Sequence, residues 1–186
     1  MAARKKEKEE KKWGSFILQL AVIIVVVVLI RSFVIGTIYV KGSSMEPNFH
    51  HGDFLLINKL EMLISEPERG DIVICSLHEN GYDENIIKRV IGEPGDVIDF
   101  RENDGYYDIY INGEKLEEDY IAEPVLSAGD WAYPMEVPEG SFFVMGDNRN
   151  ASSDSRKETI GPVSKEDIMG KVVLRIYPFG SFGLIS

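Results

Sequence analysis

Three short polar segments hold the side chains whose types and spacing could carry out hydrolytic chemistry. They are residues 42–47, 87–96 and 146–156, which read GSSMEP, IKRVIGEPGD and GDNRNASSDSR. The first offers serine hydroxyls, the second a lysine amine, and the third carboxylates, guanidinium groups and further hydroxyls. A serine is an effective nucleophile only beside a base, and a neutral lysine amine can be that base. The chemistry to consider is therefore acyl transfer to a serine.

Each segment also has a plainer interpretation when it is taken alone. A serine between a glycine and a proline usually marks a turn, and Glu46 stands where the hydrolase elbow requires a glycine. Lys88 fits an outward-facing strand lysine, and the third segment lacks the spacing of an EF-hand calcium loop. The combination of the three segments is more informative than any one of them.

The neighbours of Lys88 favour a neutral amine. At an ordinary pKa of about 10.4, only about one lysine in 2,500 is neutral at pH 7. Burial disfavours the ammonium form and can lower the pKa of a lysine by several units, and an apolar strand around Lys88 would supply that burial. A histidine is then not required, and we interpret His50, His51 and His78 as surface residues.

Composition excludes several other classes of function. The 186 residues suffice for one modest domain and a tail. The formal net charge of −11 argues against nucleic acid as a partner. Cys75 is the single cysteine, which excludes an intrachain disulfide and a cysteine-rich zinc site. With only three histidines, we expect neither a metal centre nor another cofactor.

A membrane anchor is predicted at the N-terminus. The stretch from Phe16 to Ile35 is almost wholly apolar and about as long as a bilayer-spanning helix. A cleavable signal peptide is disfavoured because the run is too long and no small-x-small site follows it. Basic residues precede the span, so the positive-inside rule places the N-terminus in the cytoplasm. We therefore predict a protein of the plasma membrane with a cytoplasmic tail over 1–14, a transmembrane helix over 15–36 and an extracytoplasmic domain over 37–186.

The sequence of residues 37–186 predicts a mainly β, antiparallel fold. Short runs rich in Ile, Val and aromatic residues predict strands at 54–57, 71–76, 86–91, 106–111, 114–116, 141–145 and 171–177. Asn112-Gly113 predicts a hairpin turn, and only Lys165 to Met169 suggests a short helix. We expect the acidic region from Asp99 to Glu123 to be a solvated hairpin whose role the sequence leaves open.

Taken in order, the anchor and the three segments resemble the bacterial type I signal peptidase family, membrane-anchored Ser-Lys proteases that remove signal peptides. A fourth signature of that family is present as Arg69-Gly70-Asp71-Ile72-Val73. The resemblance covers nearly the whole chain, and the short middle region is similar to the compact Gram-positive type. It implies preprotein signal peptides as substrates and the lipid bilayer as a partner.

The resemblance also implies a role for individual residues. Ser44, just before the methionine, corresponds to the nucleophile, and Lys88, just before the arginine, corresponds to the general base. The other implied residues support this pair: Ser152 holds the lysine amine, Asp154 and Arg156 form a supporting pair, Asp147 belongs to the scaffold, and Gly42 stands where some relatives have an oxyanion-donating serine. The backbone N–H of Ser44 remains available as a donor.

Two rival classes stay open at this stage. One is a self-cleaving Ser-Lys regulatory protein, although only 43 residues precede Ser44 and about 20 of them are apolar. The other is a non-catalytic, membrane-anchored binding module, although both the serine and the lysine are present. Geometry favours the peptidase: Ser44 follows Ile35 by nine residues, which reach at most about 30 Å, so it would act close to the bilayer surface. The oligomeric state is not predicted.

Overall fold

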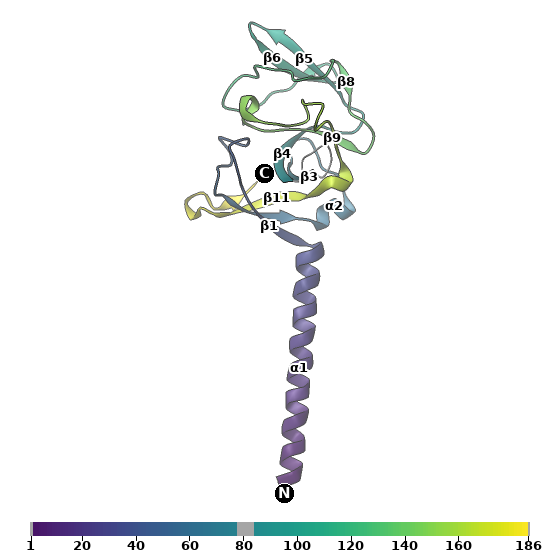
Figure 1. The fold of residues 1–186 in the computed structure, drawn as a ribbon, viewed down its shortest axis with the longest axis vertical. Helices are drawn as coiled ribbons and strands as arrows, with labels where there is room; N and C mark the ends of the chain where they lie inside the picture. The colour runs from purple at the N-terminus through teal and green to yellow at the C-terminus, as the bar shows by residue number, and fades with distance from the viewer. Residues whose placement is uncertain (1, 78–83, 186) are drawn as a thin grey trace. The chain divides into compact units, whose positions relative to one another are not determined.

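The computed structural model describes residues 2–77 and 84–185, and the chain divides into two compact units at Ile35 and Gly36. The first unit is dominated by helix α1, Ala2–Phe33 (Figure 1). Its section Ser15–Phe33 is long and apolar enough to cross a membrane. Strand β1 begins at Ile35, so the helix ends before the predicted boundary at residue 36.

The second unit is built from short strands, which confirms the mainly β prediction. In chain order the elements are β1 (Ile35–Tyr39), β2 (Phe54–Asn58), α2 (Leu60–Ile64), β3 (Ile72–Leu77), β4 (Glu84–Gly92), β5 (Val97–Asn103), β6 (Tyr106–Ile111), β7 (Glu114–Lys115), β8 (Met135–Glu136), β9 (Ser141–Met145), η1 (Arg149–Ala151), β10 (Val163–Ser164), η2 (Lys165–Asp167), β11 (Ile168–Tyr177), η3 (Phe179–Ser181) and β12 (Gly183–Leu184). All seven predicted strands are present within a few residues of their expected bounds.

The larger sheet carries the lysine segment in its middle. Its order is β1-β2-β11-β3-β4-β9-β10, with β12 paired to β11, and the register places Lys88 of β4 opposite Val73 of β3. On the other side of β4, Arg89 lies opposite Met145 of β9, the last residue before the third polar segment. Strand pairing alone therefore brings the lysine segment and the third polar segment together.

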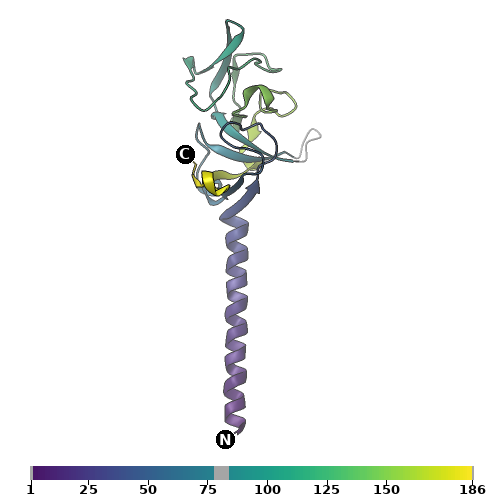
Figure 2. The same cartoon turned by 90° about the vertical axis from the view of Figure 1, so that its left-hand side faces the viewer.

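The smaller sheet has the order β7-β6-β5-β8. Asn112 and Gly113 join β6 to β7 with φ angles of 53° and 86°, as a hairpin turn of this sequence requires. Figures 1 and 2 place the β5–β6 hairpin at the end of this unit opposite β1. The smaller sheet thus stands away from β1.

Buried apolar side chains fix the serine segment to the larger sheet. Met45 and Phe49 are 1% and 2% exposed, and they pack in one cluster with Leu55, Ile74 and Ile87. At about 25 cal/mol for each Å² removed from water, two such side chains contribute several kcal/mol to holding the loop in place. The loop after Ser44 is therefore a packed part of the core.

The short helices differ from the prediction in two places. Over Lys165 to Met169 only the 3-10 helix η2 forms, where Ser164 Oγ accepts from the Glu166 N–H, and β11 begins at Ile168. Pairing of β11 with β2 and β3 overrides the local helix propensity there. The short helix α2 was not predicted, and its Leu63 and Ile64 are exposed while Met62 is buried.

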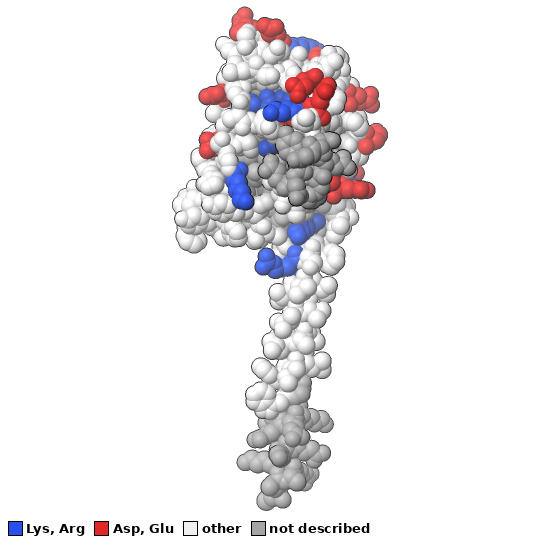
Figure 3. Space-filling view, in the orientation of Figure 1, with Lys and Arg blue, Asp and Glu red and all other residues white. Residues whose placement is uncertain are grey.

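Acidic side chains dominate the surface of the β-rich unit. From residue 37 onward the sequence has 28 Asp or Glu against 13 Lys or Arg. Figure 3 shows them spread over the visible face of this unit in several places. A net negative charge of this size repels polyanions.

Candidate active site

The side chains of Ser44 and Lys88 meet, although they lie 44 positions apart in the sequence. Lys88 Nζ is 3.0 Å from Ser44 Oγ and also donates to the carbonyl of Ile87 at 3.1 Å. Lys88 is only 3% exposed. Burial disfavours the charged ammonium form of a lysine, and a lysine must be neutral to act as a general base.

The serine loop is held in a fixed shape by its own backbone. The Glu46 N–H donates to the Ser43 carbonyl at 3.1 Å, and the Phe49 N–H donates to the Met45 carbonyl at 2.9 Å. Before the serine, Gly42 has a φ of +83°, a conformation that L side chains rarely adopt. A turn of this kind presents Ser44 at the surface of the core while Met45 points inward.

The third polar segment is hydrogen-bonded to the serine loop through Asn148. The Asn148 N–H donates to the carbonyl of Ser44 at 2.9 Å, and Asn148 Nδ2 donates to the carbonyl of Ser43 at 3.1 Å. Gly146 packs at the same point, where an added Cβ would overlap Ser152 and the carbonyl oxygen of Ser44. Both residues fix the serine backbone from outside its own loop.

Arg89 and Asp147 tie the lysine strand to the third polar segment. Arg89 Nε and Nη2 donate to the two carboxylate oxygens of Asp147, each at 2.8 Å, and the Asp147 side chain is fully buried. Two parallel bonds of this kind fix orientation as well as distance. Because Arg89 follows Lys88 directly, the pair also fixes the backbone that carries the amine.

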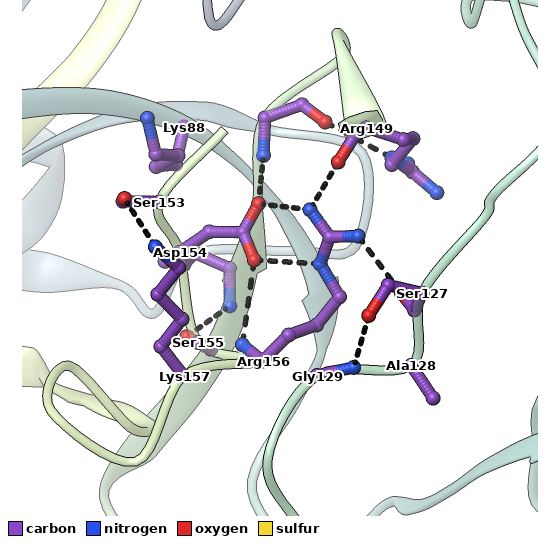
Figure 4. A network of polar contacts seen from close by, with 12 residues as sticks. Lys88, Ser127, Ala128, Gly129, Arg149, Ser153, Asp154, Ser155, Arg156 and Lys157 are labelled. Carbon is purple, nitrogen blue, oxygen red and sulfur yellow. Dashed lines mark hydrogen bonds and ion pairs between the residues drawn. The ribbon is translucent and has the colours of Figure 1, made fainter. Parts of the chain in front are cut away.

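Asp154 and Arg156 form a second buried pair inside the same segment (Figure 4). Arg156 Nε and Nη2 donate to the Asp154 oxygens at 2.8 and 2.9 Å, and the Gly146 N–H donates to Asp154 Oδ2 at 3.1 Å. Burial acts to raise the pKa of Asp154, but the hydrogen bonds and charge of Arg156 outweigh it and hold the pKa below its ordinary value. Asp154 is therefore a carboxylate across the neutral range.

Residues 13–177 match the protein family described as signal peptidase, peptidase S26. The chain belongs to this family. A signal peptidase I from Bacillus licheniformis is 38% identical over 162 residues, covering 82% of each chain. The signal peptidase I T of Bacillus subtilis is 36% identical over 187 residues, covering 95% of this chain and 90% of its own. A crystal structure of a signal peptidase I from Enterococcus faecalis aligns at 31% identity with a TM-score of 0.45, over 58% of this chain and 97% of that one.

Ser152 lies beside Gly146, close to the Ser44 carbonyl. Its Oγ is buried, and the Ser152 hydroxyl is one of the groups that hold the pKa of Asp154 below its ordinary value. The expected role of Ser152 in holding the Lys88 amine stays a prediction.

Neither of the two described histidines is buried. His50 and His51 are exposed, as predicted, and His51 Nδ1 accepts from the Gly42 N–H at 3.3 Å. His78 lies outside the described residues. Cys75 is fully buried, as expected, and burial raises its pKa to about 12. Within residues 2–77 and 84–185, no cluster of three His, Cys, Asp or Glu side chains could hold a metal ion.

Several residues around the dyad were not singled out from the sequence. They are Asn48, Arg89, Glu118, Tyr120, Asn148 and Arg149, which connect the three polar segments to one another. Arg89, Asn148 and Arg149 lie inside segments already recognised as chemical, so their polarity was a usable signal. Glu118 and Tyr120 lie in the acidic middle region, where nothing in the sequence distinguishes them from surface residues.

Proposed function

We propose that Ser44 and Lys88 are the catalytic dyad with which this signal peptidase hydrolyses preproteins. The observation that carries the proposal is the 3.0 Å contact between the Lys88 amine and the Ser44 hydroxyl. The lysine is buried in the larger sheet, and the serine is presented by a turn fixed to the core. Both are at the positions that the family resemblance implies.

In the first half of the reaction, the neutral Lys88 amine removes the proton from Ser44 Oγ as the oxygen attacks the scissile carbonyl carbon. A tetrahedral intermediate forms, and its collapse breaks the C–N bond. The Lys88 ammonium gives its proton to the departing amine. The products of this half are the free mature N-terminus and an ester that links Ser44 to the signal peptide.

In the second half, a water molecule takes the place of the departed amine. Lys88, neutral again, removes a proton from this water as its oxygen attacks the ester carbonyl carbon. Collapse of the second intermediate returns the proton to Ser44 Oγ and releases the signal peptide as a carboxylic acid, which loses its remaining proton to solvent. The dyad is then restored with no net change in its protons.

The oxyanion of each intermediate needs a hydrogen-bond donor. Among the described residues, the N–H of Ser44 makes no hydrogen bond, while its carbonyl is engaged by Asn148. This leaves the Ser44 N–H free to donate to the developing charge. A well-placed donor of this kind is worth about 3–4 kcal/mol in the transition state.

The proposed location places the reaction outside the cytoplasmic membrane. The apolar helix Ser15–Phe33 is flanked on its N-terminal side by basic residues, so the tail over 1–14 would stay in the cytoplasm and residues 37–186 outside. The bilayer is then a partner of residues 15–36. Substrate and enzyme would both be anchored, which brings the scissile bond and Ser44 to a similar depth.

Detergent-solubilised full-length protein mixed with a preprotein tests the proposal. Ser44→Ala should abolish cleavage, and Ser43→Ala is the matched control because Ser43 is exposed and offers no hydroxyl contact to Lys88 among the described residues. Cleavage of the preprotein by wild type and Ser43→Ala alone supports the proposal. Cleavage of the enzyme itself would favour the regulatory class, and no cleavage by wild type would favour a binding module.

A further inference from the structure

The segment between β7 and β8 contacts the lysine strand and the third polar segment. One of its carboxylates is buried, although the sequence predicted a solvated region. Glu118 lies in the acidic region expected to be a surface hairpin, yet its side chain is only 7% exposed. The β5–β6 hairpin is solvated on one face only: Arg101 and the partly exposed Asp99 form an ion pair there, while Phe100 and Ile109 are buried on the other face. The prediction is therefore wrong at Glu118, whereas Glu117, Asp119 and Glu123 are exposed as expected, and the buried carboxylate needs an explanation.

Glu118 is bound to Arg149 of the third polar segment. Arg149 Nη1 and Nη2 donate to the two oxygens of Glu118 at 2.7 and 2.6 Å, and the Arg149 side chain is fully buried. The Tyr120 hydroxyl donates to the same carboxylate at 2.6 Å. Burial raises the pKa of Tyr120, and Glu118 raises it further. The hydroxyl therefore stays a proton donor throughout the pH range of an assay.

Tyr120 also contacts the lysine strand and the loop that follows Ser44. Its ring lies 4.0 Å from the guanidinium carbon of Arg89, the residue after Lys88. Its carbonyl accepts from Asn48 Nδ2 at 2.7 Å, four residues after Ser44. A cation over an aromatic face is attracted most strongly when it is desolvated, and Arg89 is only 7% exposed.

These contacts continue to the backbone around the nucleophile. Arg149 Nε donates to the carbonyl of Gly146 at 3.0 Å. Gly146 packs against the carbonyl of Ser44, and Asn148 donates to that same carbonyl. One short stretch of the middle region is thus connected to the serine loop, the lysine strand and the third polar segment.

We propose that Glu118 and Tyr120 form a clasp that positions Ser44 and Lys88 for proton transfer. The inference rests on the proposed function. Neither residue touches the reacting atoms, so both are positioning residues. Without the Tyr120 ring and the Glu118 charge, Arg89 and Arg149 lose partners in a buried site and must rearrange, which shifts the lysine strand and the loop around Gly146. A displacement of about 1 Å between reacting groups is enough to lower a rate by about a hundredfold.

The fold supplies a matched control for the aromatic contact. Tyr110 of β6 lies 3.9 Å from the guanidinium carbon of Arg101, a geometry close to that of Tyr120 over Arg89. This second pair belongs to the smaller sheet and contacts none of the three catalytic segments among the described residues. Tyr110→Leu removes the same kind of interaction as Tyr120→Leu without disturbing the clasp.

The experiment measures kcat and KM for preprotein cleavage by the full-length protein in detergent, with circular dichroism to confirm folding. Tyr120→Leu should lower kcat about ten- to a hundredfold and change KM by less than about threefold. Tyr120→Phe keeps the ring over Arg89 and should retain most of kcat. Tyr110→Leu should match wild type in both constants.

A folded Tyr120→Leu with wild-type kcat would overturn the clasp, and so would a change confined to KM, because that would place Tyr120 in substrate binding. If Tyr120→Leu fails to fold, Glu118→Gln is tested in its place, because it keeps the shape of the side chain but removes the charge that faces Arg149. An unchanged kcat for Glu118→Gln would refute the proposal. Ser44→Ala and Lys88→Met distinguish a failure of the proposed function from a failure of the clasp. If either stays active, the proposed function fails; if both are inactive while clasp variants behave as wild type, only the clasp fails.

Discussion

The amine of Lys88 lies 3.0 Å from the hydroxyl of Ser44 in a site where the lysine is 3% exposed. The two residues come from unrelated local structures, a turn and the middle of strand β4. Core packing holds the turn, and one buried ion pair, Arg89 with Asp147, holds the strand to the third polar segment. The contact is therefore a product of the whole β-rich unit.

Gly42→Ser tests whether the backbone before the nucleophile needs glycine. The sequence alone allows that a serine there adds an oxyanion donor and raises the rate. The φ of +83° changes this expectation, since an L side chain costs about 1–2 kcal/mol in that conformation, even though its Cβ would meet open space. We expect slower cleavage. Gly105→Ser, with a φ of +90° in the β5–β6 turn, is the control and should leave kcat unchanged. A faster Gly42→Ser enzyme would refute the backbone argument.

Gly146→Ala should damage the site by overlap. Its Cβ would collide with Ser152 and with the carbonyl oxygen of Ser44. Overpacking of this kind costs about 1–3 kcal/mol, and the required shift moves the nucleophile, so kcat should fall about a hundredfold. Gly180→Ala is the control because nothing lies within 4 Å of its Cβ. Equal kcat values for the two variants would contradict the close packing at Gly146.

Asp154→Asn should destabilise the protein in a pH-dependent way. The folded-state pKa of Asp154 is lowered, so its stabilising effect is complete above the unfolded pKa of about 3.9 and is lost as pH falls through the folded pKa. Breaking a buried ion pair costs about 3–5 kcal/mol. The difference from wild type in urea unfolding should be large at about pH 6 and smaller at about pH 3.

The control for that measurement is Asp99→Asn, which disrupts the exposed pair with Arg101. Exposed pairs contribute about 0–1 kcal/mol, so this variant should resemble wild type at both pH values. A difference for Asp154→Asn that stays constant down to about pH 3 would show that its carboxylate is not stabilised by Arg156.

Membrane orientation can be tested by proteolysis of intact cells. The basic tail and the apolar helix predict that protease added outside digests the chain after Tyr39 and spares Met1 to Trp13. Tags at each end, read before and after cell lysis, identify the protected fragment. Protection of the C-terminal part in intact cells would reverse the orientation and remove the substrate from reach.

The sequence predicted most of the fold because short apolar runs and turn residues report local structure directly. Asn112-Gly113 and the strand at Ser141–Met145 are examples. Strand β5 was missed because its VIDFREN sequence is too charged to read as a strand, yet it pairs with both β6 and β8. Tertiary pairing decides such segments, and it is invisible in a local pattern.

The site residues divide in the same way, into those that a local pattern reveals and those that only the fold brings together. Ser44 and Lys88 could be found because each lies in a short segment whose residues are unusual together. Glu118 and Tyr120 could not, since Glu118 meets Arg149 across 31 positions and the Tyr120 carbonyl meets Asn48 across 72. A carboxylate in an acidic stretch is normally solvated, and only the fold reveals that this one faces a buried guanidinium.

The central claim is that Lys88 is the base for Ser44, and Lys88→Met tests it most directly because it removes the amine and keeps an apolar stem of similar length. The measurement is preprotein cleavage by folded full-length variants from about pH 5 to about pH 10. Wild type should lose activity on the acidic side, about tenfold per pH unit once the amine is mostly protonated. Lys88→Met should be inactive throughout, and Lys165→Met, at a partly exposed lysine, should match wild type. A folded Lys88→Met that cleaves at the wild-type rate would contradict the Ser-Lys mechanism.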